Sequence, residues 1–517
     1  MQRRPVLATA LFLLCSPVSI GRATAAGSCV NLTQLSIPQT TITRAESVMA
    51  GAFVPEGVRG SAGGRGDSFA GMPAFCRVTL TSKPSTDSDI RIEVWLPESG
   101  WNGRLQAVGD GGLAGFIPYS LMAPALAAGY VAAGTDTGHV GGTAEFMPQH
   151  PEKLVDFAYR STHQLAVAAK AVATAYYSQA PTWTYYNACS GGGRHALTSA
   201  QRYPSDFNGI VAGASTWDQA RLDTGRIGIN LTVNRTVGSR IPAAKYSMVH
   251  DAVLQACDGI DGVKDGVIED PRACRFDYAS LTCPGADRPS CLTAAQVASA
   301  KVLTTPFVDP LSGTVLLSSH LRPGSELLWA TLGGPQPLTN SLERVRRFHL
   351  KDPSWEFRLD AIGSDLDRAV RGDGGLLASN SYDLKPFFSS GGKLLMWHGW
   401  SDPQVPAEHS ILYYENVLRT VGADAQQSIA LFMLPGVSHC GSGPGPDTFD
   451  KMGSITAWVE QGRKPDRIVA SHVTAGQVDR TRPLCPFGTI AHYNGSGSTD
   501  DAANFSCVVA ERAADVR

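Results

Sequence analysis

The chain has 517 residues, of which 43% are hydrophobic, and its formal net charge at pH 7 is −2. This length exceeds the roughly 100–200 residues of an ordinary domain, so we expect one large domain with an insertion, or two domains. No long run of lysine and arginine occurs, and neither the charge nor its distribution favours binding to nucleic acid.

Residues 1–26 are typical of a secretory signal peptide. Two arginines precede an apolar run from Pro5 to about Ile20, and small residues follow at 23–26. The run is shorter than the roughly 20 apolar residues that span a bilayer, so a membrane anchor is disfavoured. A lipoprotein is also disfavoured, because Cys15 follows a leucine rather than a small residue. We therefore predict a secreted or periplasmic chain without a membrane anchor.

The cysteine count agrees with export. Ten cysteines follow the predicted cleavage point, and an even number in an exported chain indicates a disulfide framework. No Cys-x-x-Cys spacing typical of zinc or redox sites occurs. Three pairs are close enough in sequence to form local bridges, and the connectivity is otherwise open: Cys257 with Cys274, Cys283 with Cys291, and Cys485 with Cys507.

Strand-like and helix-like segments alternate along much of the chain. Residues 154–177 predict an alanine-rich helix, and residues 182–203 predict a strand, a tight turn at 190–193 and a helix from 194. This alternation predicts an α/β fold with a mostly parallel sheet, the architecture of an α/β-hydrolase core. The predicted strands cover residues 90–96, 105–108, 129–134, 182–188, 393–397 and 429–434.

The pattern changes between about Trp217 and Ala378, where the sequence becomes irregular and holds four cysteines. The core strands resume at Lys393, so we prefer an insertion to a separate trailing domain. The predicted organisation is a lid domain over 217–379, with α/β-hydrolase core segments over 27–216 and 380–517.

A nucleophile elbow is predicted at Ser190, because a strand, a Gly-rich turn and a helix follow one another there. The amide of Gly191 is the candidate for half of an oxyanion hole. The other half is expected from Gly111 or Gly112, in the Gly-rich loop after the strand at 105–108. A plain flexible turn is the alternative for either motif.

Two dipeptides far apart in the chain, Cys189-Ser190 and His439-Cys440, predict the catalytic base. A disulfide holds its two Cα atoms roughly 5.5 Å apart, so a bridge between these cysteines would bring the serine and the histidine together.

Asp402 follows the strand at 393–397 and gives the chain order Ser, Asp, His of α/β-hydrolases. Asp447 and Asp450 come after the predicted base and fit this order less well. Two other histidines, His195 and His398, are expected to form local hydrogen bonds rather than to act as the base.

An acidic loop beginning at Asp258 is a candidate calcium site. Carboxylates alternate with glycines there, and calcium accepts six to eight oxygen ligands. The spacing differs from that of an EF-hand, and no histidine or open carboxylate pair accompanies the loop, so the predicted role of the ion is structural. A solvated acidic turn is the alternative. The expected ligands are Asp258, Asp261, Asp265 and the carbonyls of Val263 and Val267.

Together these motifs resemble the tannase and feruloyl esterase family, which also includes the enzyme that hydrolyses mono(2-hydroxyethyl) terephthalate. The most specific segments are 189–194, 203–214, 258–267, 398–402 and 435–446. The resemblance implies an α/β-hydrolase with a large lid, a Ser-His-Asp triad and a lid calcium. One departure is Ala188, where family members usually have glycine. The resemblance also implies five bridges: Cys29–Cys76, Cys189–Cys440, Cys257–Cys274, Cys283–Cys291 and Cys485–Cys507.

The resemblance implies hydrolysis of small aromatic esters of feruloyl or galloyl type, free or attached to a polysaccharide or polyphenol. The alternatives are a terephthalate monoester hydrolase and a non-catalytic, calcium-stabilised binding protein. Arg368 or Arg371 is a candidate partner for a substrate carboxylate or phenol. Six aromatic residues could form flat pocket walls, with core packing as the competing explanation: Trp217, Trp329, Trp355, Phe357, Phe387 and Phe388.

Overall fold

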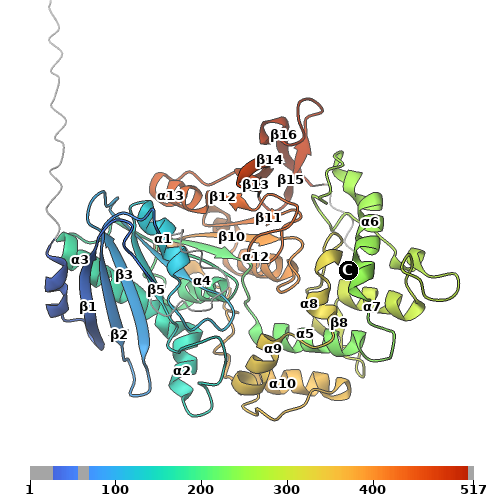
Figure 1. The fold of residues 1–517 in the computed structure, drawn as a ribbon, viewed down its shortest axis with the longest axis horizontal. Helices are drawn as coiled ribbons and strands as arrows, with labels where there is room; N and C mark the ends of the chain where they lie inside the picture. Colours follow the sequence, from blue (N-terminus) through green and yellow to red (C-terminus); the bar gives the residue numbers. More distant parts are fainter. Residues whose placement is uncertain (1–26, 56–68, 511–517) are drawn as a thin grey trace, which may run out of the picture.

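The computed structural model describes residues 27–55 and 69–510, so the predicted signal peptide lies outside the described residues. A nine-stranded sheet forms the centre, with strand order β1-β2-β3-β5-β4-β6-β7-β10-β11 (Figure 1). Its strands are β1 (Thr40–Val48), β2 (Phe75–Ser82), β3 (Ile90–Pro97), β4 (Arg104–Gly109), β5 (Val131–Thr135), β6 (Trp183–Cys189), β7 (Gly209–Gly213), β10 (Lys393–Gly399) and β11 (Ile429–Leu434).

Strands β5, β4, β6, β7, β10 and β11 pair in parallel, whereas β1, β2 and β3 add an antiparallel edge. The parallel strands all end at one edge of the sheet, where the loops that follow them can carry a site. The predicted α/β class with a mostly parallel sheet is confirmed, and each strand predicted from the sequence lies within two residues of an observed one.

Helices cover both faces, as the side-chain alternation along β10 shows. Leu394 and Met396 belong to the core under α3, α4 and α12, whereas Leu395 and Trp397 belong to the core under α1 and α13. Because successive residues of a strand point to opposite faces, both faces need an apolar cover. These helices are α1 (Tyr119–Ala127), α3 (Ser161–Tyr177), α4 (Gly191–Arg202), α12 (Glu408–Val421) and α13 (Lys451–Gln461).

Two predicted boundaries differ from the structure. Helix α4 begins at Gly191, not at residue 194, so most of the predicted tight turn is helical. A Cβ atom on Gly193 would lie 2.5 Å from the Gly213 carbonyl oxygen, which explains why glycines occupy the first turn of a helix packed against β7. The helix predicted at 154–177 is divided into α2 (Pro151–Val155), a π-helical segment (Asp156–Arg160) and α3.

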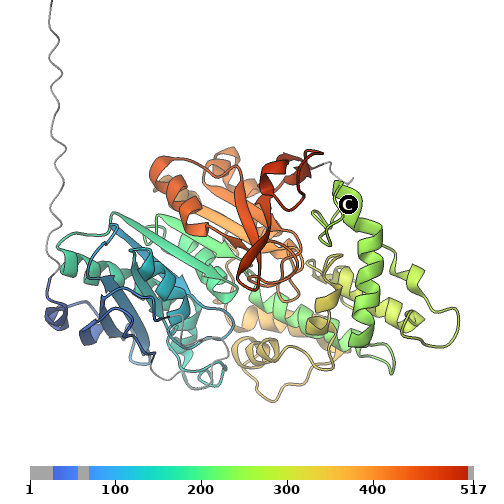
Figure 2. The same cartoon turned by 45° about the horizontal axis from the view of Figure 1, so that its top comes forward.

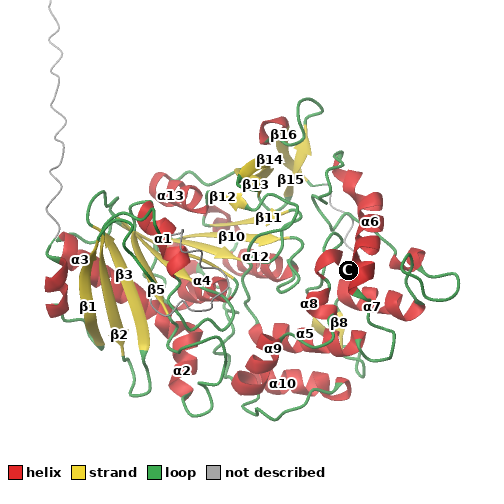
Figure 3. Ribbon diagram, in the orientation of Figure 1, coloured by secondary structure: helices red, strands yellow, loops and turns green. Residues whose placement is uncertain are grey.

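Residues 217–379, hereafter the insert, combine several helices with long irregular stretches (Figure 3). They build a hydrophobic core of their own around α5. Glycines weaken the helical signal of α5, but a Cβ on Gly228 would lie 2.4 Å from Phe307, so the close packing of the β8–β9 hairpin requires glycine there. Elements of the insert are α5 (Gln219–Val233), α6 (Tyr246–Cys257), α7 (Ala294–Thr304), β8 (Phe307–Val308), β9 (Val315–Leu317), α8 (Ala330–Gly333), α9 (Thr339–Arg344) and α10 (Ile362–Gly372).

The chain after β11 adds two small sheets, which lie above β11 in Figure 1 and reach toward α6 of the insert in Figure 2. Among the described residues no helix is long and apolar enough to cross a membrane. Helix α11 (Lys385–Ser389) precedes β10, and the late strands are β12 (Thr448–Phe449), β13 (Ile468–Thr474), β14 (Gln477–Leu484), β15 (Thr489–Tyr493) and β16 (Phe505–Val509).

Candidate active site

Ser190 occupies a sharp turn between β6 and α4. Its φ of 61° lies in the left-handed region, and its amide donates a hydrogen bond of 2.9 Å to the Gly213 carbonyl. A non-glycine residue at positive φ is uncommon and is found where the surroundings hold it, as at a nucleophile elbow. Ala188 is tolerated here because residue 192 is glycine: a Cβ on Gly192 would lie 2.7 Å from the Ala188 Cβ.

The structure brings Ser190, His439 and Asp402 together. Ser190 Oγ lies 2.8 Å from His439 Nε2, and Asp402 Oδ2 lies 2.7 Å from His439 Nδ1. The carboxylate accepts the Nδ1 proton, so Nε2 can accept a proton from the serine hydroxyl. The three side chains therefore have the connectivity that activates a serine nucleophile.

Asp402 is buried among donors. Its Oδ1 accepts the amides of Gln404 (2.8 Å) and Val405 (2.9 Å), and its Oδ2 also accepts the Nε2 proton of His398 (3.1 Å). Burial by itself would raise the pKa of Asp402, but the charge of His439 and the hydrogen bonds from both histidines outweigh it and hold that pKa far below its ordinary value. The carboxylate is thus ionised whenever His439 must carry a proton.

The bridge between Cys189 and Cys440 is present, with its Cα atoms 6.0 Å apart. It joins the residue before Ser190 to the residue after His439, although 251 positions separate the two cysteines. The structure contains five disulfides in the described residues, and their pairings are those that the family resemblance implies.

The two candidates for the second oxyanion amide differ in their surroundings. The amide of Gly111 donates to Asp110 Oδ1 at 2.7 Å, whereas the amide of Gly112 donates to no residue that the structure describes. A Cβ on Gly191 would lie 3.1 Å from the Gly112 nitrogen, so the loop after β4 closely approaches the start of α4. The Gly112 amide is the free donor beside Ser190.

A cavity of about 730 Å³ opens beside Ser190 and His439. Its walls come from β4, β6, β10, α1 and the start of α13, with aliphatic side chains on α1 and the indole of Trp397 on β10. The six aromatic residues predicted as pocket walls do not line this cavity, nor do Arg368 and Arg371. Trp329 and Phe387 are fully buried in hydrophobic cores, which is the competing role expected for them.

Sequence reasoning missed Gln106, Asn187 and Lys451, which line the same cavity. Gln106 offered a signal, because it is a polar residue inside an apolar buried strand. Lys451 offered none, since a lysine at the start of a helix is usually solvated.

The remaining histidine and aspartate candidates have local roles. Burial, with the charge of Arg194, lowers the pKa of His195 to about 3, and its Nε2 lies 2.7 Å from the Phe157 carbonyl oxygen. Asp450 caps α13 by accepting the Gly453 amide at 2.7 Å, and Asp447 accepts the Ser442 amide at 2.6 Å. None of the three contacts the triad.

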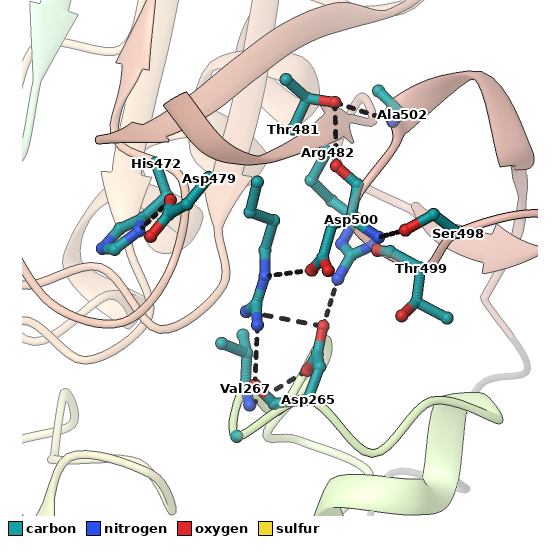
Figure 4. Close-up of polar contacts among 12 residues, drawn as sticks. Asp265, Val267, His472, Asp479, Thr481, Arg482, Ser498, Thr499, Asp500 and Ala502 are labelled. Atoms are coloured by element: carbon teal, nitrogen blue, oxygen red, sulfur yellow. Dashed lines mark hydrogen bonds and ion pairs between the residues drawn. The ribbon is translucent and has the colours of Figure 1, made fainter. Parts of the chain in front are cut away.

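The acidic loop packs against the late strand β14 (Figure 4). Asp265 forms ion pairs with Arg482 and, at 3.6 Å, with Arg480, and Arg480 also donates to the Asp265 carbonyl at 3.1 Å. Arg480 Nε also forms an ion pair with Asp500 Oδ1 at 3.1 Å. The acidic loop of the insert is therefore linked to the C-terminal part of the chain.

The loop's other carboxylates accept its own amides. Asp258 accepts the Gly266 amide at 3.2 Å, and Asp261 accepts the Val263 amide at 2.9 Å. Burial, with the charges of Asp265 and Asp258, raises the pKa of Asp261 to about 6. In the part of the chain that the structure describes, no three His, Cys, Asp or Glu side chains converge as a ready metal site. Calcium binding by this loop stays a prediction.

Comparisons with known proteins agree with the geometry. The family model described as "Tannase and feruloyl esterase" matches residues 76–344 and 357–508. An esterase from Xanthomonas campestris pv. campestris is 35% identical, over 95% of this chain and 93% of the relative. A probable feruloyl esterase B-2 from Aspergillus terreus is 33% identical, over 84% of this chain and 86% of the relative.

Among solved structures, the crystal structure of feruloyl esterase B from Aspergillus oryzae is similar with a TM-score of 0.84 and 28% sequence identity. The superposition covers 93% of this chain and 99% of that one. The similarity thus includes the insert as well as the core.

Proposed function

The chain belongs to the tannase and feruloyl esterase family and is a carboxylic ester hydrolase, and we propose that it cleaves aromatic acyl esters through an acyl-enzyme on Ser190. The single observation that carries this proposal is the unbroken contact from Ser190 Oγ through His439 to Asp402, at 2.8 and 2.7 Å. The non-catalytic binding protein considered from the sequence is not retained, since the relatives are named esterases.

The proposed reaction has two halves. His439 Nε2 takes the Ser190 proton as the oxygen attacks the ester carbonyl, and it returns the proton to the departing alcohol. Water then repeats the sequence on the acyl-enzyme and releases the acid. Asp402 stabilises the imidazolium in both halves.

The oxyanion is assigned to the amides of Gly191 and Gly112. Both amides lie close to Ser190, and Gly112 is preferred to Gly111 because the latter's amide is already bonded to Asp110. Fixed amide donors at a developing oxyanion typically account for about 2.7–4 kcal/mol each.

The acyl group is proposed to be of feruloyl or galloyl type, and a terephthalate monoester is the second candidate. The aliphatic and indole walls of the cavity support a flat apolar group, and Lys451 in the same cavity favours the second candidate. The test compares kcat/KM for methyl ferulate, methyl gallate and mono(2-hydroxyethyl) terephthalate. Turnover of none of them, with a titrated and folded enzyme, would contradict the aromatic assignment.

We also propose export and a structural calcium. Five disulfides are typical of proteins that fold in oxidising compartments. The donors of the acidic loop, carboxylates and carbonyls, are the types that calcium prefers. Asp258, Asp261, Asp265 and the carbonyls of Val263 and Val267 would hold the ion.

The calcium proposal is tested by metal analysis and by thermal unfolding. Chelation is expected to lower the Tm of the wild-type protein, because the ion binds only the folded state, and to have a smaller effect on Asp261→Asn. A calcium-free preparation whose Tm does not rise when calcium is added would refute it.

A further inference from the structure

The cavity beside Ser190 runs along the sheet face under α1 and α13. Its lining residues within the described chain come from the core strands, these helices and the active-site loops, and none comes from the insert. β4 and β10, which both contribute to it, are separated by β6 and β7. Three strand spacings correspond to about 14 Å, enough for a substituted aromatic group.

Several polar groups on its walls have no partner. Gln106 is only 5% exposed and Asn187 is half-buried, and neither side-chain amide forms a hydrogen bond with a described residue. Trp397 Nε1 is buried and equally unpaired among the described atoms. Buried polar groups in native proteins are nearly always paired, so the unpaired Trp397 nitrogen, beside two amides that are open to the cavity, favours a polar ligand there.

Lys451 supplies the charge in this set. Its ammonium lies 5.0 Å from the centre of the Trp397 ring and 4.0 Å from that of Phe449, and it forms neither a hydrogen bond nor an ion pair with any residue described. Asp447 and Asp450 act on it only at longer range, and both accept backbone amides elsewhere. Lys451 is also the first residue of α13, where the helix dipole disfavours a cation.

The other titratable groups that line the cavity come from both edges of the sheet: Asp110 and His439 lie at the catalytic edge, whereas Tyr130 precedes β5 at the opposite edge. Asp110 follows β4, and burial raises its pKa, which favours its neutral form. Burial likewise raises the pKa of Tyr130, so the phenol is neutral at ordinary pH. His439 is the catalytic base itself. Burial lowers the pKa of Lys451, whereas the charges of Asp447 and Asp450 raise it, and no other lysine or arginine lines the cavity within the described chain.

On the basis of the function proposed above, we infer that this cavity binds the half of an ester substrate that carries a carboxylate, with Lys451 as the residue that recognises the carboxylate. Two strand spacings, about 10 Å, separate β6 below Ser190 from β10 below Lys451, which suits one aromatic ring between ester and carboxylate. Trp397 offers its face to that ring, and Gln106 and Asn187 bind further oxygens of the same group.

A carboxylate can belong to the acid half or the alcohol half of the ester, and two matched pairs of substrates distinguish them. Monomethyl terephthalate is compared with methyl 4-carbamoylbenzoate, and the benzoate ester of 4-(hydroxymethyl)benzoic acid with that of 4-(hydroxymethyl)benzamide. In one pair the wild-type enzyme is expected to favour the carboxylate by roughly 10- to 100-fold in kcat/KM, the usual range for a charged hydrogen bond.

Lys451→Met is expected to remove this preference mainly through KM, because the contact is made equally in the ground and transition states. Lys451→Arg should retain much of it. The matched control is Lys385→Met, an exposed lysine on α11 outside the cavity, which should leave the preference unchanged. No preference in either pair, or one that survives Lys451→Met, would overturn the inference.

Binding without turnover separates this inference from the proposed function. Calorimetry of monomethyl terephthalate and of the 4-(hydroxymethyl)benzoate ester is performed with Ser190→Ala and with Ser190→Ala/Lys451→Gln. Weaker binding of either ester by at least tenfold in the double variant supports the site, even if no aromatic ester is hydrolysed. Equal binding in both proteins would refute it. Failure of the proposed function is seen separately, as absence of turnover of every aromatic ester, neutral or charged, by the wild type.

Discussion

The two sides of Ser190 differ in how their polar groups are satisfied. On the side of His439, each oxygen of Asp402 has at least two donors, and the histidine contacts both the serine and the aspartate. On the cavity side, Gln106 and Asn187 form no side-chain hydrogen bond with a described residue, and Lys451 contacts aromatic rings but no described carboxylate. The hydrogen-bonded triad can act on any ester that reaches Ser190. The polar side chains of the cavity can instead bind only those substrates that carry matching polar groups.

The largest effect is expected for Ser190→Ala. Loss of the nucleophile should lower kcat by about 10⁶-fold for neutral and charged esters alike, because the chemistry on both sides depends on it. The measurement is turnover per folded molecule, with the Tm as a check on folding. Activity within tenfold of wild type would exclude Ser190 as the nucleophile.

Asp402→Asn probes the paired side alone. The variant keeps the shape of the residue but favours the wrong tautomer of His439, and we expect kcat to fall by about 10⁴-fold. The ratio of kcat/KM between carboxylate-bearing and neutral esters should stay constant. If that ratio changes strongly, the two sides are not as separate as their hydrogen bonding indicates.

Cys189→Ala with Cys440→Ala addresses the bridge that borders both sides, since both cysteines also line the cavity. The chain-entropy model gives a loss of about 5.5 kcal/mol in the free energy of unfolding for a loop of this length. Misplacement of a catalytic group by 1 Å can lower the rate by about 100-fold, so we expect kcat to fall beyond the loss of folded protein. Near-wild-type kcat per folded molecule would show that the bridge contributes to stability only.

Asp136, which follows β5, is a buried aspartate that contrasts with Asp402. Its Oδ1 accepts the amides of Arg91 and Gly138, but its Oδ2 has no partner among the described atoms, and burial raises its pKa to about 7. The folded state therefore binds this proton more tightly than the unfolded state does between about pH 4 and 7. The contribution of Asp136 to stability is present at low pH and is lost as the pH rises through 7.

Asp136→Asn should remove this dependence with little effect on turnover. The stability of the wild type relative to the variant is expected to decline by a few kcal/mol between about pH 4 and 8. Denaturant unfolding of both proteins across this range provides the measurement. A constant difference would mean that Asp136 is ionised throughout.

The sequence predicted strands and catalytic residues correctly where the local pattern is compatible with a single structure. Strand β11 was predicted at its observed bounds because a continuous apolar run suits a buried parallel strand. Ser190, His439 and Asp402 were identified because strand, turn and cysteine context restrict where such residues can lie.

Other features depended on contacts between distant segments. Gly191–Gly193 suggested a turn, but their lack of side chains allows α4 to pack on β7, a contact visible only in three dimensions. The cavity combines β4 and α1 with the start of α13, which follows them by more than 300 residues, so no local sequence pattern predicts it. The aromatic residues of the insert were predicted as pocket walls from residue type alone, but Trp329 packs in the hydrophobic core of the insert.

The separation of 251 positions between Cys189 and Cys440 has a consequence for biogenesis. The other four bridges close over 47, 17, 8 and 22 positions, so each can form soon after its segment emerges during the proposed export. Cys189 must instead stay unpaired, or exchange partners, while the whole insert passes. A disulfide isomerase is therefore expected to determine the yield of active enzyme, and esterase activity should appear last among the signs of maturation.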